Sequence, residues 1–232
     1  MPSLGHLLAF GALLLPAISV AGPQSPTERF EARYRSARTL RAEFLERYSE
    51  NGKLIRAEAG IAYFRKPGKM RWQYEKPENN LFLVDGKTAW LYTPADHTAT
   101  KVPARQSEDW RTPFVLLAGG MKLSRICAKV ESTSLLLPQN PADATLECKL
   151  KGAGAARTAN PEDAPPQVFF EISVNGELVR LLLRSPGGVE TEFQFKNWQI
   201  NPSVPDSLFQ FSPPPGVVIV DGLLPTSPGF RQ

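Results

Sequence analysis

Hydrophobic and polar residues alternate along most of the chain after residue 38. From Thr39 to Tyr48, the apolar residues Leu40, Ala42 and Phe44 alternate with polar ones. A period of two residues is typical of a strand with one buried face. The same pattern predicts strands at Ile55–Phe64, Lys69–Tyr74, Leu81–Val84, Thr88–Tyr92, His97–Val102, Ile126–Ser132, Thr145–Leu150, Val168–Val174, Leu178–Arg184 and Val189–Trp198.

Short turns separate several of these predicted strands. The pairs Asn51-Gly52, Asp85-Gly86 and Asn175-Gly176 are typical of tight hairpin turns. Strands joined by such turns run antiparallel and lie next to each other. About ten strands in this order predict a mainly β fold, either a strongly curved antiparallel sheet or a barrel that does not close.

Two segments change to a helical period. Ser25–Ala37 opens with a capping-box pattern, and its Phe30 and Tyr34 lie four residues apart on one side. Asp109–Ala118 carries three apolar residues at i, i+4 and i+7. Helices before and within a meander can cover one open end of the sheet.

The first 21 residues are typical of an export signal. His6–Val20 is an apolar run too short to span a bilayer comfortably, and Ser19 and Ala21 are small residues suited to a cut after Ala21. The segment lacks the usual basic start, and a buried N-terminal helix is the alternative. Because a proline interrupts the run and polar residues follow, we favour a cleaved signal peptide at residues 1–21.

Residues 22–232 then have the size of one domain with a sizeable core. The net charge is +4, and the 27 basic residues are interleaved with 23 acidic ones. A nucleic-acid-binding protein would show a denser basic stripe, so we expect no nucleic-acid partner. The Pro- and Gly-rich tail from about Pro213 predicts irregular structure apart from a short strand at Val217–Val220.

The chain has two cysteines, Cys127 and Cys148. In an oxidising compartment they can pair, because the turn-forming segment Pro138–Pro141 between them favours a hairpin. Two separate buried thiols are the alternative. A metal site is not expected, since the two cysteines lie far apart in sequence and the only histidines are His6 and His97.

Catalytic motifs are scarce. The chain has no nucleophile elbow, no HExxH motif and no phosphate loop. His97 lies in a predicted surface turn, and the scattered carboxylates nominate no acid/base pair. The sequence therefore favours a binding protein over an enzyme and implies no cofactor.

Large apolar side chains are abundant on the predicted strands and on the central helix. Their simplest role is a plain sheet core. A curved sheet covered by short helices can instead keep a hollow apolar interior, which would suit an acyl chain. The candidate lining residues are Phe44, Phe64, Met70, Trp72, Phe82, Trp90, Phe114 and Leu117.

Four segments in order resemble the LolA family of periplasmic lipoprotein carriers. Gly60–Pro77 is similar to the family's Gly, apolar strand, basic residue and Pro, aromatic-rich strand and Pro, and Leu83–Pro94 carries its Asp-Gly and Trp-x-Tyr-x-Pro pattern. Thr112–Ala118 and the ending at Phe209–Val217 are also similar to the family's. The resemblance covers most of the chain from Pro26 onward.

The resemblance implies an unclosed antiparallel β-barrel with a helical lid over a hydrophobic cavity. It implies a monomeric periplasmic carrier that accepts acylated lipoproteins from an inner-membrane ABC transporter and passes them to an outer-membrane receptor. The receptor of that pathway shares the fold but is lipid-anchored, and the absence of a Cys after Ala21 favours the carrier. A periplasmic regulator of the same fold that senses lipids or mislocalised lipoproteins is the alternative, and a periplasmic hydrolase is a third hypothesis.

In the family, an Arg just before the strand-ending Pro ties the lid to the barrel. That position is Lys66 here, with Arg65 one residue earlier. Neighbouring strand residues face opposite sides, so Arg65 cannot simply replace the family's Arg. Lysine keeps the charge but lacks the fork of donors, so the resemblance predicts a weaker lid latch at Lys66.

Overall fold

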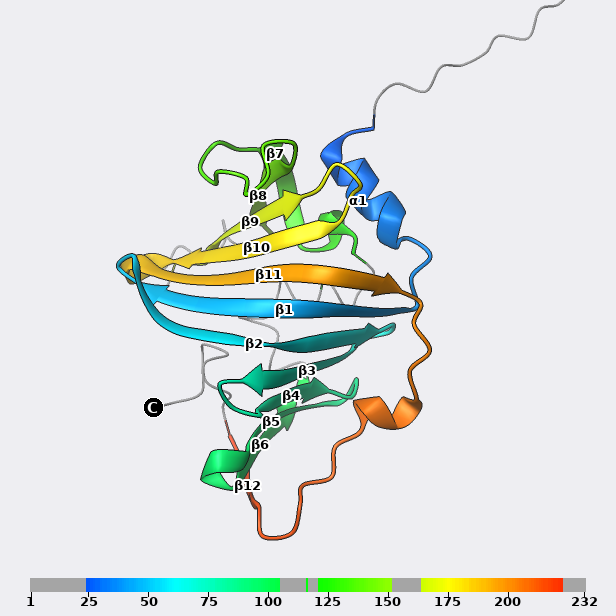
Figure 1. The fold of residues 1–232 in the computed structure, drawn as a ribbon, viewed down its shortest axis with the longest axis vertical. Helices are drawn as coiled ribbons and strands as arrows, with labels where there is room; N and C mark the ends of the chain where they lie inside the picture. Colours follow the sequence, from blue (N-terminus) through cyan, green and yellow to red (C-terminus); the bar gives the residue numbers. More distant parts are fainter. Residues whose placement is uncertain (1–23, 105–115, 117–120, 152–163, 223–232) are drawn as a thin grey trace, which may run out of the picture.

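A single twelve-stranded sheet forms the body of the protein (Figure 1). The structure is a computed structural model that describes residues 24–104, 116, 121–151 and 164–222. The strands are β1 (Thr39–Glu50), β2 (Lys53–Arg65), β3 (Lys69–Lys76), β4 (Leu81–Val84), β5 (Thr88–Thr93), β6 (Thr98–Pro103), β7 (Cys127–Ser132), β8 (Ala144–Leu150), β9 (Gln167–Ile172), β10 (Leu178–Ser185), β11 (Val189–Ile200) and β12 (Val218–Asp221).

The sheet consists of two meanders joined side by side. Strands β1 to β6 pair in sequence, as do β7 to β11, and the long strands β1 and β11 pair between the two groups. The order runs from β12 and β6 at one edge to β7 at the other, and the sheet curls without these edges pairing (Figure 1). The predicted antiparallel, unclosed β architecture is confirmed.

Strand β12 departs from the predicted antiparallel pattern. It nearly coincides with the strand predicted at Val217–Val220, but it runs parallel to β6, with Val218 opposite Thr98. After β11 the chain crosses the outside of the sheet through the short 3-10 helix η6 (Asp206–Phe209) before it reaches β12 (Figure 1). This crossover brings the chain back in the direction of β6, which a hairpin could not do.

The inner face of the sheet, defined as the face that carries the main core, follows the predicted alternation. On β1 the residues Leu40 and Ala42 are buried, and on β3 the residues Met70, Trp72 and Tyr74 are buried. All of these side chains belong to one hydrophobic cluster. The two-residue period of the sequence therefore identified this face of both strands correctly.

Helix α1 (Pro26–Tyr34) covers one end of the inner face (Figure 1). Ser25 and Glu28 form the predicted capping box, and Phe30 and Tyr34 are fully buried in the main core. The Leu178 N–H donates a hydrogen bond to the Tyr34 hydroxyl at 3.2 Å, which ties α1 to β10. The helix ends three residues earlier than predicted, and a turn then leads into β1.

The remaining described helical segments are short. They are the 3-10 turns η1 (Pro94–Asp96), η3 (Leu123–Arg125) and η5 (Pro186–Gly188), together with the single described helical residue Leu116. None of the helices in the described part of the chain is long and apolar enough to cross a membrane.

Candidate functional site

Five of the predicted lining residues lie together on the inner face. Phe44, Phe64, Met70, Trp72 and Phe82 belong to the main core and are at most 6% exposed. Trp72 is central, because its ring lies 4.8 Å from that of Phe44 and 5.5 Å from that of Phe64, both edge-on. The inner face thus carries a buried, mainly aromatic group of side chains contributed by strands β1 to β4.

Trp90 lies on the other face, so its prediction as a lining residue was wrong. It pairs with Leu83, and its ring lies 5.4 Å from Phe211 in the segment that crosses the outside of the sheet. Its neighbours Ala89 and Leu91 pack with the main core instead. Both faces of β5 are apolar, so alternation alone could not assign them.

The predicted central helix, Asp109–Ala118, lies almost wholly outside the described residues, and Phe114 and Leu117 are among those not described. Leu116 is the exception. It is helical and 1% exposed, and it packs in the main core.

Lys66 and Arg65 point to different parts of the molecule, as expected for strand neighbours. The Lys66 ammonium donates to the backbone carbonyl of Tyr34 at 3.5 Å, at the C-terminal end of α1. Arg65 forms an ion pair with Asp206, and its guanidinium lies 4.8 Å from the ring centre of Phe209 on the outside of the sheet. Lys66 is therefore the residue of the two that contacts a helix covering the inner face.

A cluster of polar side chains, which no sequence motif indicated, continues the inner face beyond the aromatic side chains. Glu46 on β1 stands directly opposite Glu58 on β2, and both carboxylates are at most 3% exposed. The Tyr74 hydroxyl donates to Glu46 Oε2 at 2.7 Å, and Arg56 Nε lies 2.8 Å from Glu58 Oε2. Asn80, at 2% exposed, completes this group, which we call the acidic cluster.

Burial dominates the protonation of the acidic cluster. It raises the pKa of Glu46 to about 8, although the Tyr74 hydrogen bond opposes the shift, and the neighbouring Glu58 adds to it. Burial also raises the pKa of Glu58, while Arg56 lowers it. Glu46 therefore carries a proton at neutral pH, because its own hydrogen bond is too weak to offset the loss of water.

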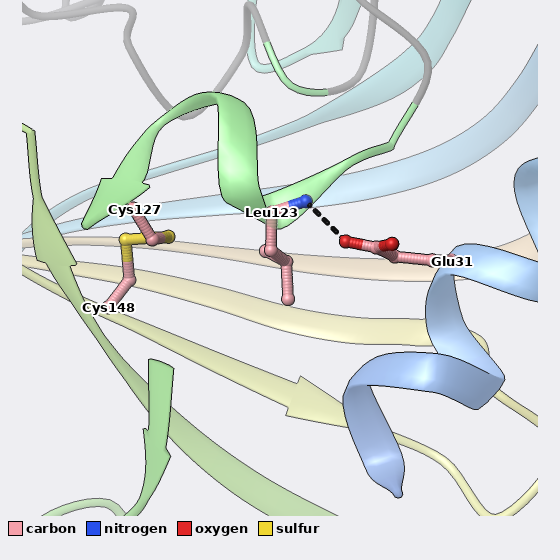
Figure 2. The surroundings of a disulfide bond; sticks show 4 residues. All are labelled: Glu31, Leu123, Cys127 and Cys148. Atoms are coloured by element: carbon pink, nitrogen blue, oxygen red, sulfur yellow. Dashed lines mark hydrogen bonds between the residues drawn. A yellow bond between two sulfur atoms is a disulfide. The ribbon is translucent and has the colours of Figure 1, made fainter. Parts of the chain in front are cut away.

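A disulfide joins Cys127 to Cys148 across the neighbouring strands β7 and β8 (Figure 2). Both cysteines belong to the main core. Beside them, the Leu123 N–H donates to the Glu31 carboxylate of α1 at 3.0 Å (Figure 2). This contact links the covering helix to the segment that leads into the disulfide hairpin.

The described residues offer little for metal or nucleophilic chemistry. Within them, no three His, Cys, Asp or Glu side chains are grouped to hold a metal ion. His97 ends the turn η1 with a left-handed backbone conformation. The arrangement instead suits the burial of apolar groups against aromatic walls.

A family model described as "Outer membrane lipoprotein carrier protein LolA" matches residues 35–212. An outer-membrane lipoprotein carrier protein of Nitrosospira multiformis is 30% identical over 80% of this chain and 83% of its own length. A protein of the same description from Chromobacterium violaceum is 30% identical over 90% of this chain and 97% of its own length.

The fold has a counterpart among solved structures. The crystal structure of an uncharacterized conserved protein from Thermus thermophilus matches 85% of this chain and 97% of its own, with a TM-score of 0.50 and 12% identity. That likeness supports the fold alone. The matched residues 35–212 take in every strand from β1 to β11, and the chain therefore belongs to the LolA family of outer membrane lipoprotein carrier proteins.

Proposed function

We propose that this protein is a periplasmic carrier that takes acylated lipoproteins from an inner-membrane ABC transporter and delivers them to an outer-membrane receptor. The observation that supports it most is the aromatic inner face of an open sheet, with Trp72 between Phe44 and Phe64. Membership of the LolA family and relatives named as lipoprotein carriers point the same way. The function is binding and transfer, with no chemical step.

The physical need for such a carrier follows from the hydrophobic effect. Each CH₂ group removed from water gains about 0.8 kcal/mol, so a lipoprotein anchor with several acyl chains cannot leave a membrane unshielded. An apolar face that is part of a curled but unclosed sheet can cover such chains and release them again. In this proposal residues 1–21, which lie outside the described structure, direct export and are then removed.

A release assay tests the proposal. Spheroplasts that hold an acylated lipoprotein in their inner membrane should shed it into solution when the mature protein is added, as a complex of the two. An unrelated soluble protein at the same concentration is the control. Binding of the lipoprotein without its transfer to receptor-bearing membranes would favour the sensor hypothesis, and absence of any complex would contradict the carrier.

Lys66→Leu is expected to speed lipoprotein transfer to receptor-bearing membranes more than it changes folding. The substitution removes the hydrogen bond from the ammonium to the Tyr34 carbonyl, and with it a cation at the C-terminal end of α1. For such a partly exposed contact we expect a stability loss below about 1 kcal/mol. Lys76→Leu, which alters an exposed lysine at the end of β3, is the matched control. A transfer rate equal to that of the wild type would contradict a latch at Lys66.

A further inference from the structure

The acidic cluster lies on the same inner face that the proposed function assigns to acyl chains. On β1, Glu46 follows Ala42 and Phe44 in the row of buried inward residues. On β2, Glu58 stands in the same row as Phe64. The cluster therefore forms a polar end to an otherwise apolar wall, and an amphiphile lying along that wall would bring its polar end to it.

The hydrogen-bond donors within this cluster leave some of its buried oxygens without a partner. The Tyr74 hydroxyl donates a hydrogen bond to one oxygen of Glu46. Arg56 forms an ion pair with Glu58, and the Asn80 side chain forms a hydrogen bond with the same carboxylate. The second oxygen of Glu46, Oε1, and the side-chain oxygen of Asn80 are buried and accept no hydrogen bond within the described part of the chain. Buried acceptors without a donor are rare in folded proteins, and both of these belong to side chains no more than 2% exposed.

The charges around Glu46 come from few groups. Glu58 and Arg56 face it from β2 and Tyr74 from β3, and Glu78 acts on Glu58 from the turn before β4. On its other side Glu46 is opposite Phe193 of β11, which brings no charge. With Glu46 ionised, a ligand group with N–H donors would satisfy the free oxygens, whereas an anionic group would place further acceptors beside two carboxylates. Protonated Glu46 has an O–H donor of its own and discriminates less between the two kinds of group.

We propose that Glu46, Glu58 and Asn80 form a head-group filter that favours amphiphiles whose polar end presents N–H donors and disfavours those whose polar end is an anion. This inference rests on the proposed function, because it needs an acyl chain on the inner face. An acylated protein presents amide N–H groups beside its chains, whereas fatty acids present only acceptors when ionised. The filter thus favours protein cargo over anionic lipids.

Titration calorimetry of the mature protein with dodecylamine and dodecanoate, each below its micelle concentration, tests the filter. We expect at least about tenfold tighter binding of dodecylamine at pH 8.5, and a smaller preference at pH 6.5, where Glu46 is protonated. At pH 7, binding of the ammonium should release about one proton as Glu46 ionises, measured from the heats in two buffers of different ionisation enthalpy.

Two variants complete the experiment. Glu46→Gln should abolish the proton release and reduce the preference to about threefold or less. Glu43→Gln changes the same charge on the exposed face of the same strand and should behave as the wild type. If Glu46→Gln does not fold, the pH dependence and proton release of the wild type still decide the question.

The outcomes separate the filter from the proposed function. Equal affinity of the wild type for both amphiphiles, or an unchanged preference in folded Glu46→Gln, overturns the filter while acyl binding stands. Binding of neither amphiphile overturns both the filter and the acyl-binding function on which it rests.

Discussion

Gly60→Ala is expected to destabilise the protein by about 3 kcal/mol or more. A Cβ atom added at Gly60 would lie 1.9 Å from the backbone oxygen of Gln73 and 2.9 Å from the Cα of Tyr74. These are backbone atoms of β3, which cannot rotate away as a side chain could. Strands β2 and β3 would have to separate where their register already shifts, between Ala59 and Gly60.

Urea unfolding of the two proteins measures this effect. Gly222→Ala is the matched control, because a Cβ there meets only a Val220 side-chain carbon at 4.0 Å and the residue does not have a positive φ. We expect the control to lie within about 0.5 kcal/mol of the wild type. A loss below about 1 kcal/mol for Gly60→Ala would mean that β2 and β3 separate easily at this point.

Alternation predicted the inner face wherever only one face of a strand is apolar. Leu40, Ala42 and Phe44 on β1 alternate with polar residues, and the structure buries them as expected. On β5 the two faces carry Ala89 and Leu91 against Trp90 and Tyr92, so the pattern has no preferred side. There the face is decided by Phe211, which is distant in sequence and packs on both aromatic rings.

The alternation of residues places both carboxylates of the acidic cluster on the inner face, but the pattern of a single strand does not show that they are buried. Glu46 is an even number of positions from Phe44, and Glu58 is an even number from Phe64. Alternation alone would therefore place both carboxylates on the inner face. Strand carboxylates are more often solvated, and only the pairing of three strands shows that these two are enclosed. The parallel pairing of β12 was likewise hidden, because it depends on the path of the chain outside the sheet.

Glu46→Gln is expected to make unfolding much less dependent on pH between pH 4.5 and pH 8.5. In the folded protein the pKa of Glu46 is raised to about 8 from an ordinary value of 4.5, mainly by burial. Below pH 4.5 the group is protonated in both states and has no effect. As the pH rises, Glu46 ionises first in the unfolded chain. The free energy of unfolding therefore falls by about 1.4 kcal/mol per pH unit, and by up to about 5 kcal/mol at pH 8.

Urea unfolding at pH 4.5, 6.5 and 8.5 measures this prediction. Glutamine cannot ionise, so the variant should match the wild type at pH 4.5 within about 1 kcal/mol and exceed its stability by several kcal/mol at pH 8.5. Glu43→Gln, on the exposed face of β1, should follow the wild type at every pH. Because burial also raises the pKa of Glu58, a smaller slope of the same sign should remain in Glu46→Gln.

A stability difference that does not grow with pH would mean that Glu46 is already ionised in the folded protein. It would then have no proton to release when an ammonium group binds, so this measurement also tests the charge state on which the head-group filter depends.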